Sequence, residues 1–258
     1  MKQSVRNILT LCTGALLAAL YILTLTAERS HTRAQSCQGL KVSIADSASL
    51  KFVSEEDIAR YMDEYGAYVG KLVEDVDLES IEEILSSKSA IRSCEAYIDR
   101  DGFIHTEIVQ REPVIRFQKG ALGFYADEKG FLFPLQKNYT SRVPIIDGAI
   151  PLTVDEKFKG KPASEKEELW LQEIIALTAH LQRTGWSKRI SQISVLPDGN
   201  LVLIPTEGKE RFLFGTPTRV DEKLLRIASY YEAVAPAHEK GYYSRVDVRF
   251  DKQIICKK

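Results

Sequence analysis

The first folded stretch of the chain changes its hydrophobic period from two to about 3.6 and back to two. Apolar and polar residues alternate over 40–46, which predicts a strand. The stretches 54–66 and 77–90 each keep their apolar residues on one helical face. Residues 91–113 form two alternating runs joined at Asp101-Gly102, which is typical of a hairpin. The predicted order is strand, helix, helix, strand, strand.

The rest of the chain has the pattern of a strand-rich domain with two helices. Short apolar runs are separated by Gly and Pro, which predicts short strands and turns. Ser164 and Glu167 match a capping box that opens a helix over 164–185, and a second helix is expected over about 221–233. Residues 242–258 alternate again and predict a closing strand. The predicted fold class is therefore α+β.

One uncharged apolar run precedes both regions, at residues 8–27. At 1.5 Å per residue, twenty helical residues span about 30 Å, the thickness of the hydrocarbon core of a bilayer. Lys2 and Arg6 precede the run and, by the positive-inside rule, indicate a cytoplasmic tail at 1–7. The sequence predicts a single transmembrane helix, a linker at 28–36 and an exported remainder.

A cleaved signal peptide is the alternative for the same run. Its apolar region would normally be about 7–15 residues long and would end in a small-x-small cleavage site. Here the run is longer, and Leu25 is bulky where a small residue is needed. Both interpretations export the rest of the chain.

Charge and motif content indicate no catalysis and no nucleic-acid partner. Lysine and arginine number 35 against 36 acidic residues, so there is no basic excess that would attract nucleic acid. The four histidines (His31, His105, His180 and His238) are scattered without metal-ligand spacing. No nucleophile elbow or phosphate-binding loop is present in the sequence. We therefore expect a protein that is not an enzyme and that has no metal or cofactor.

The cysteines allow two interpretations. Cys12 lies within the predicted span, whereas Cys37, Cys94 and Cys256 fall in the exported part, where disulfides are permitted. Three is an odd number, so at least one of them is free or paired with another chain. A Cys37–Cys94 bridge and a role as small buried hydrophobic residues both remain open.

Several stretches, taken in order, resemble the FtsQ/DivIB family of bacterial division proteins, in its Bacteroidetes-like branch. The strand-helix-helix-strand-strand order is that of the family's POTRA domain. Residues 110–117 (QREPVIRF) resemble the junction that follows it, and residues 125–134 (YADEKGFLFP) and 143–148 (VPIIDG) resemble the next two family motifs. The resemblance implies a POTRA domain at 37–112 and a β domain at 113–258.

What the resemblance implies is assembly in the inner membrane at the division septum, with the C-terminal part in the periplasm. In this family the POTRA domain is associated with recruitment and with contacts to other division proteins. The last strands bind an FtsB/FtsL-type bitopic coiled-coil partner, which adds a strand to an exposed sheet edge. The complex helps to regulate septal peptidoglycan synthesis. The lipid bilayer would be contacted through residues 8–27.

The resemblance also indicates which residues would bind this partner. The stretch SRVDVRF at 244–250 is similar to the family's penultimate strand, with alternating Val246, Val248 and Phe250 on its apolar face. On the strand after it, Ile254 and Cys256 would face one way and Ile255 and Lys257 the other. The expected partner-binding residues are Phe250, Gln253, Ile254, Ile255, Cys256, Lys257 and Lys258.

Three other interpretations stay open at this point. The last strand could simply close its own sheet without a partner. An exported protein of outer-membrane assembly or secretion could also carry a POTRA domain, although the sequence has no run of barrel strands. An exported hydrolase is the third, and the lack of a nucleophile-base or metal constellation argues against it.

Overall fold

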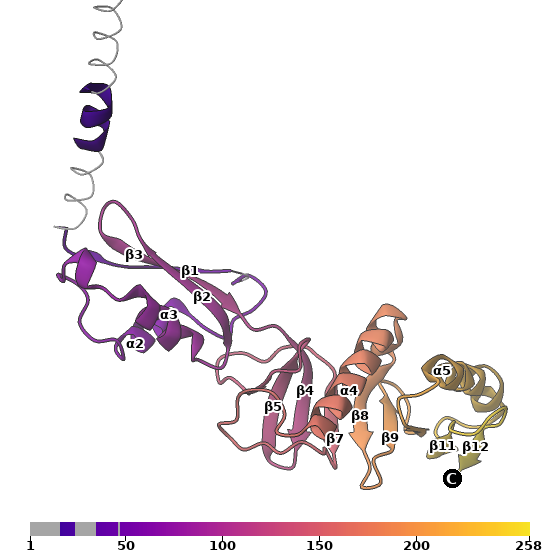
Figure 1. Ribbon diagram of the computed structural model, residues 1–258. Helices are drawn as coiled ribbons and strands as arrows, with labels where there is room; N and C mark the ends of the chain where they lie inside the picture. Colours follow the sequence, from indigo (N-terminus) through magenta and orange to yellow (C-terminus); the bar gives the residue numbers. More distant parts are fainter. Residues whose placement is uncertain (1–15, 24–34, 46) are drawn as a thin grey trace, which may run out of the picture. The chain divides into compact units, whose positions relative to one another are not determined.

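The computed structural model describes residues 16–23, 35–45 and 47–258 (Figure 1). Residues 16–23 are helical and exposed. Within these ranges, no helix is both long enough and apolar enough to cross a membrane. The predicted span at 8–27 falls largely outside the described residues, as do the tail at 1–7 and most of the linker at 28–36. The transmembrane helix therefore stays a prediction.

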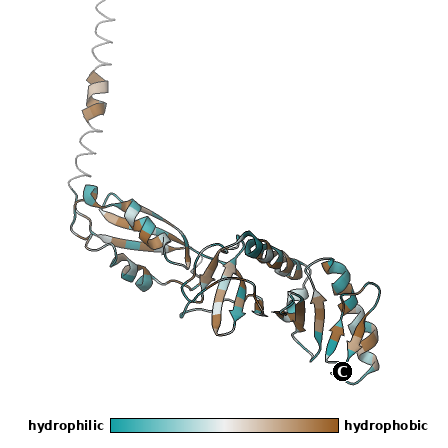
Figure 2. Cartoon of the chain, turned by 60° about the horizontal axis from the view of Figure 1, so that its bottom comes forward, coloured by the Kyte–Doolittle hydropathy of each residue, from teal (hydrophilic) through white to brown (hydrophobic). Residues whose placement is uncertain are grey.

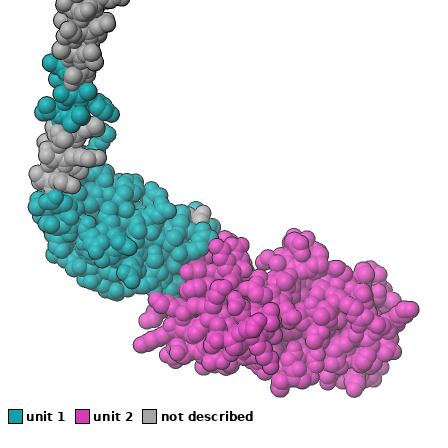
Figure 3. All heavy atoms as spheres, in the orientation of Figure 1, with its two compact units in different colours: residues 1–49, 53–110 teal, residues 50–52, 111–258 magenta. Residues whose placement is uncertain are grey.

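The chain divides into two compact units, which Figure 3 shows in different colours. Unit 1 comprises Met1–Ser49 and Val53–Gln110, and unit 2 comprises Leu50–Phe52 and Arg111–Lys258. In unit 2 the ring of Phe52 makes edge contacts with the rings of three other aromatic residues, Tyr125, Phe133 and Tyr139.

Unit 1 has the predicted strand-helix-helix-strand-strand order. Its strand β3 lies between β1, which it pairs with in parallel, and β2, which it pairs with antiparallel. A 3-10 turn, η1, which the sequence pattern did not indicate, precedes the second helix. The elements are β1 (Gly39–Ile44), α2 (Glu55–Met62), η1 (Val73–Asp75), α3 (Leu78–Ser86), β2 (Ile91–Ile98) and β3 (Phe103–Gln110).

Side-chain hydrogen bonds fix the starts of the helices and the hairpin of unit 1. Ser54 and Asp57 form a reciprocal capping box on α2, and the Asp77 carboxylate accepts from the backbone N–H of Ser80 at the start of α3. Asp99 accepts from the backbone N–H groups of Asp101 and Phe103 and so closes the β2–β3 turn. The predicted hairpin is confirmed.

Unit 2 is built on one nine-stranded mixed sheet. Along the sheet the strand order is β12-β11-β10-β9-β8-β7-β4-β5-β6, with parallel pairs β4–β7, β7–β8 and β10–β11. The strands are β4 (Pro113–Lys119), β5 (Leu122–Asp127), β6 (Leu132–Pro134), β7 (Ile145–Gly148), β8 (Ile190–Val195), β9 (Leu201–Pro205), β10 (Arg211–Gly215), β11 (Arg245–Asp247) and β12 (Ile255–Lys257).

Two α-helices, α4 (Glu165–Arg183) and α5 (Val220–Ser229), pack their buried residues with the apolar side of this sheet. Figure 2 shows many hydrophobic residues on the strands and hydrophilic ones on the helices. The core includes Phe117, Ile193, Phe212, Val246, Leu177 and Ile227. The two predicted helices are confirmed, and three short helical segments accompany them: η2 (Trp186–Lys188), η3 (Tyr230–Val234) and η4 (Ala235–Ala237).

Two details differ from the prediction. The helix expected over 221–233 leaves α geometry after Ser229 and continues as the π-helical turn η3, which buries Tyr230. The capping box of α4 is only half formed. Ser164 accepts from the N–H of Glu167, but the Glu167 carboxylate accepts from the N–H and hydroxyl of Thr153 instead of reaching back to Ser164.

A buried ion pair joins two stretches that carried the family resemblance. Arg111 lies just before β4, and its guanidinium donates to Asp127 at the end of β5 at 2.7 Å. The same guanidinium lies over the ring of Phe131 at 3.7 Å. Asp127 also accepts from the backbone N–H groups of Lys129 and Phe131, so this carboxylate organises the turn between β5 and β6.

Candidate functional site at the C-terminal sheet edge

The last strand of the chain is an edge strand. β12 pairs antiparallel with β11, placing Lys257 opposite Arg245, Cys256 opposite Val246 and Ile255 opposite Asp247. In the part of the chain that the structure describes, β11 is the only strand paired with β12 (Figure 1). The other hydrogen-bonding side of β12 is therefore an open sheet edge.

The two faces of β12 differ as the alternation predicted. Ile254 and Cys256 are partly buried and pack against the core of unit 2. Ile255 and Lys257 are exposed on the opposite face. The open edge of β12 is therefore flanked by one apolar and one solvent-facing side.

The turn before β12 corrects one expectation. Val246, Val248 and Phe250 were predicted to alternate on one strand, but β11 ends at Asp247. The Asp247 carboxylate accepts from the backbone N–H of Arg249 at 3.1 Å and from its guanidinium at 2.9 and 2.7 Å. The chain then bends at Phe250 and turns at Asp251 and Lys252. Val248 is fully buried, whereas Phe250 is 42% exposed.

The pKa of Asp247 reflects its contact with Arg249. Burial acts to raise the pKa of Asp247, but the hydrogen bonds and the positive charge of Arg249 outweigh it and hold this pKa below its ordinary value. Asp247 is therefore ionised at neutral pH and is engaged by Arg249.

Helix α5 holds the turn in place. The Arg226 guanidinium donates to the carbonyl oxygen of Val248 at 3.1 Å and to the Asp251 carboxylate at 3.3 Å. Arg219 also pairs with Asp251. We refer to β11, residues 248–254 and β12 together as the C-terminal hairpin. Its contacts with α5 hold the turn before β12 in one conformation.

Two shallow depressions lie on the helix-free face of the sheet. One, of about 270 Å³, is at the hairpin and is lined by Arg245, Asp247, Arg249, Phe250, Ile255 and Lys257. The other, of about 500 Å³, is lined by residues of β8 to β11 and the segments next to them, including Val202, Leu213, Arg211 and Lys209. Arg245 belongs to both, so the two depressions share one wall.

The seven predicted partner-binding residues fall within one short segment. Phe250 and Gln253 lie in the turn, Ile254 leads into the strand, and Ile255, Cys256 and Lys257 form it. Lys258 follows and lies over the Tyr242 ring at 4.2 Å.

Arg211 and Arg245 line the same face and were missed at the level of sequence. Strand register brings Arg211 beside Arg245, and local sequence does not encode register.

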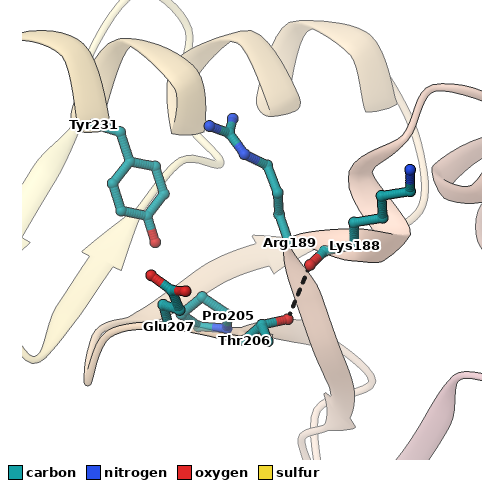
Figure 4. Close-up of a pocket in the computed structure, with 6 residues that line it drawn as sticks. All are labelled: Lys188, Arg189, Pro205, Thr206, Glu207 and Tyr231. Carbon is teal, nitrogen blue, oxygen red and sulfur yellow. Dashed lines mark hydrogen bonds between the residues drawn. The ribbon is translucent and has the colours of Figure 1, made fainter.

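Another cavity, of about 380 Å³, lies elsewhere in unit 2, between the end of β9 and η3 (Figure 4). It is lined by Lys188, Arg189, Pro205, Thr206, Glu207 and Tyr231. The Thr206 hydroxyl donates to the carbonyl of Lys188 at 3.3 Å. Burial and a hydrogen bond to Glu210 raise the pKa of Tyr231 above its ordinary value, so its phenol stays protonated at neutral pH. The cavity contains none of the predicted residues.

The cysteines outside the predicted span are free thiols in the structure, so the possible Cys37–Cys94 bridge is not formed. Burial raises the pKa of the Cys94 thiol to about 11, and burial also raises the pKa of Cys256. Both thiols are protonated at neutral pH and are poor nucleophiles.

Among the described residues, no three His, Cys, Asp or Glu side chains lie together in a way that could hold a metal.

Comparison with known proteins places both units. The family model described as FtsQ/DivIB, C-terminal related, matches residues 112–257, and a POTRA-like domain model matches residues 35–109. No curated protein matches the chain. The first match alone covers more than half of the 258 residues. The order of elements in unit 1 and the strand-rich unit 2 agree with these two matches, and the chain belongs to the FtsQ/DivIB family.

Proposed function

We propose that this protein is a bitopic inner-membrane scaffold of the division machinery that captures an FtsB/FtsL-type coiled-coil partner on β12. Family membership indicates a non-enzymatic division scaffold that works through protein–protein interactions. The finer proposal is that the partner adds a strand to the sheet of unit 2 and that the complex regulates septal peptidoglycan synthesis. Unit 1 would contact other division proteins and recruit the chain to the septum.

The open edge of β12 is the observation that carries this proposal. An unpaired edge invites strand addition, in which backbone hydrogen bonds supply affinity and alternate side chains supply specificity. The edge is short, at three residues, and α5 fixes the turn before it. A short, rigid edge suits a specific partner better than indiscriminate pairing.

The membrane part of the proposal depends on the sequence alone. Residues 8–27 carry no charge and are long enough to span a bilayer as a helix. The basic residues before them favour a cytoplasmic N-terminus, so both units would lie in the periplasm.

In-cell photocrosslinking tests the docking edge. A photoreactive amino acid is placed in turn at Gln253, Ile255 and Lys257, whose side chains are exposed. We expect crosslinks at these positions to a small bitopic coiled-coil protein. The matched control is Ile254, which packs against the core and should crosslink weakly or within its own chain.

The opposite outcome is equally clear. If all three exposed positions give no crosslink while the protein remains at the septum, β12 only closes its own sheet. Depletion of the protein gives a second test at the level of the cell. Normal septation after depletion would rule out the division role itself.

A further inference from the structure

Three cationic side chains lie directly opposite one another across the last three strands of the sheet. In the β10–β11 pair Arg211 is opposite Arg245, and in the β11–β12 pair Arg245 is opposite Lys257. All three are exposed, while their neighbours Phe212 and Val246 are buried on the other face. We call Arg211, Arg245 and Lys257 the cationic row.

Within the described residues, no acidic side chain forms an ion pair with this row. None of the ion pairs within 4.0 Å in the described part of the chain includes a member of the row. Asp247 lies on the same face of β11 and is attracted by the charge of Arg245, but both of its carboxylate oxygens accept hydrogen bonds from Arg249, so it compensates the row only in part. Lys209, also exposed, adds a further positive charge to the depression that Arg211 and Arg245 line.

Like charges directly opposite each other destabilise a sheet, so the row has a cost in the isolated protein. The row also ends at the open edge, because Lys257 belongs to β12. Any strand added to β12 places one of its own residues opposite Lys257. An acidic residue there would attract Lys257 directly and Arg245 one strand further away.

The next position on the same face adds a second requirement. Ile255 lies two residues before Lys257 and is exposed, and it lines the small depression together with the exposed ring of Phe250. A residue opposite Ile255 would bury apolar surface if it were itself apolar. The edge therefore combines a charge requirement and an apolar requirement two positions apart.

We propose that the segment docking on β12 is an acidic strand, with Asp or Glu opposite Lys257 and an apolar residue two positions along, opposite Ile255. This inference rests on the proposed function, because it specifies the chemistry of the strand that the edge accepts. The cationic row also disfavours pairing between the β12 strands of two copies of this chain, since that would bring more positive charge to the edge.

A peptide library displayed on phage tests this chemistry against the full chain immobilised in detergent micelles. The library consists of short strand-forming peptides in which alternate positions are randomised. We expect Asp or Glu to be enriched several-fold at one randomised position, with apolar residues enriched at the adjacent randomised position. The enrichment should weaken as salt is added, because exposed charges are screened.

A charge reversal makes the assignment specific. With Lys257→Glu, the same randomised position should change its preference to Lys or Arg. The control is Lys188→Glu, an exposed residue on η2 outside the row, which changes net charge equally and should leave the preference acidic. Thermal unfolding of each variant verifies that it is folded, as expected for substitutions at exposed positions.

The possible results distinguish a failure of the acidic-strand inference from a failure of docking at β12. Peptides that bind with no acidic preference, and that Lys257→Glu does not alter, would overturn the inference and leave edge docking in place. If no peptide is selected and the crosslinking experiment is also negative, edge docking and the inference fail together. An acidic preference that reverses with the charge at position 257 supports both.

Discussion

At the scale of single residues, the Arg111–Asp127 pair has the clearest consequence for stability. Both side chains are nearly buried, with exposed fractions of 11% and 6%. Removing one partner of a buried ion pair leaves the other charge uncompensated in a low-dielectric environment. Arg111 and Asp127 come from two different sequence motifs, so the pair also explains why both motifs belong to one structural feature.

We expect Arg111→Met to lower the free energy of unfolding by about 3–5 kcal/mol. Urea denaturation of the wild type and variant measures the change. The double variant Arg111→Met with Asp127→Asn should recover part of the loss, since the amide keeps an acceptor for the turn without the unpaired charge. A double variant as unstable as the sum of both single changes would contradict this account.

Asp99 leads to a prediction about pH. Hydrogen bonds from His105, from the backbone N–H of Phe103 and from Lys41 hold the pKa of Asp99 far below its ordinary value. A group whose pKa is lowered by folding stabilises the protein above its unfolded pKa of about 3.9. This stabilisation is lost as pH falls from there through the lowered folded pKa.

Asp99→Asn should therefore be less stable than the wild type at neutral pH, and the difference should shrink below about pH 4. Denaturation curves recorded from neutral to acidic pH provide the measurement. Asp101→Asn is the control, because the Asp101 side chain accepts none of these hydrogen bonds. A stability difference that stays constant with pH would show that the charge of Asp99 is not responsible.

At the scale of elements, the end of β7 depends on a glycine. Gly148 has a φ of +89°, and a Cβ there would lie 2.3 Å from the carbonyl oxygen of Val195 on the neighbouring strand β8. Gly199 has a similar φ of +81°, but a Cβ added to it would meet no neighbouring atom within 4 Å. An alanine at either position would pay the cost of a positive φ, but only an alanine at Gly148 would also clash with the neighbouring strand.

We expect Gly148→Ala to destabilise the protein by about 1–3 kcal/mol more than Gly199→Ala. The difference reflects the displacement of β7 from β8, since a backbone oxygen cannot move aside as a flexible side chain can. Chemical denaturation of both variants gives the comparison. Equal losses would mean that β8 can shift without cost.

The cationic row affects stability as well as binding. Lys257→Gln removes one of two like-charge contacts, so the free energy of unfolding should rise by about 0.2–1 kcal/mol at low salt. The gain should disappear at about 1 M salt, where the screening length is about 3 Å. Lys188→Gln should show no such gain. A loss of stability in Lys257→Gln would mean that Lys257 has a favourable contact within the chain.

At the scale of the whole molecule, the two units are expected to carry separable tasks. Removing residues 251–258 deletes β12 together with Asp251, and with it the proposed docking edge. We expect the truncated chain to stay at the septum, because recruitment is assigned to unit 1, but to lose the coiled-coil partner. Fluorescence localisation and co-purification measure the two properties independently, and retention of the partner would contradict the assignment to β12.

Much of the architecture follows from local sequence. Hydrophobic period and the Asp101-Gly102 turn predicted the element order of unit 1, and the structure confirms it. The alternation at the end of the chain correctly separated Ile254 and Cys256 from Ile255 and Lys257. These signals are local because they depend on residues a few positions apart.

Other features required the tertiary structure. The edge position of β12, the ion pair between Arg111 and Asp127 and the cationic row all join residues far apart in the chain. Val246 and Val248 keep the predicted alternation, since both are fully buried, but Phe250 departs from it because the chain bends at Phe250 and turns at Asp251 and Lys252. The sequence by itself thus determined the α-helices, the element order of unit 1 and the resemblance to the family. Only tertiary structure decided strand pairing and register, because these depend on long-range packing that no local period encodes.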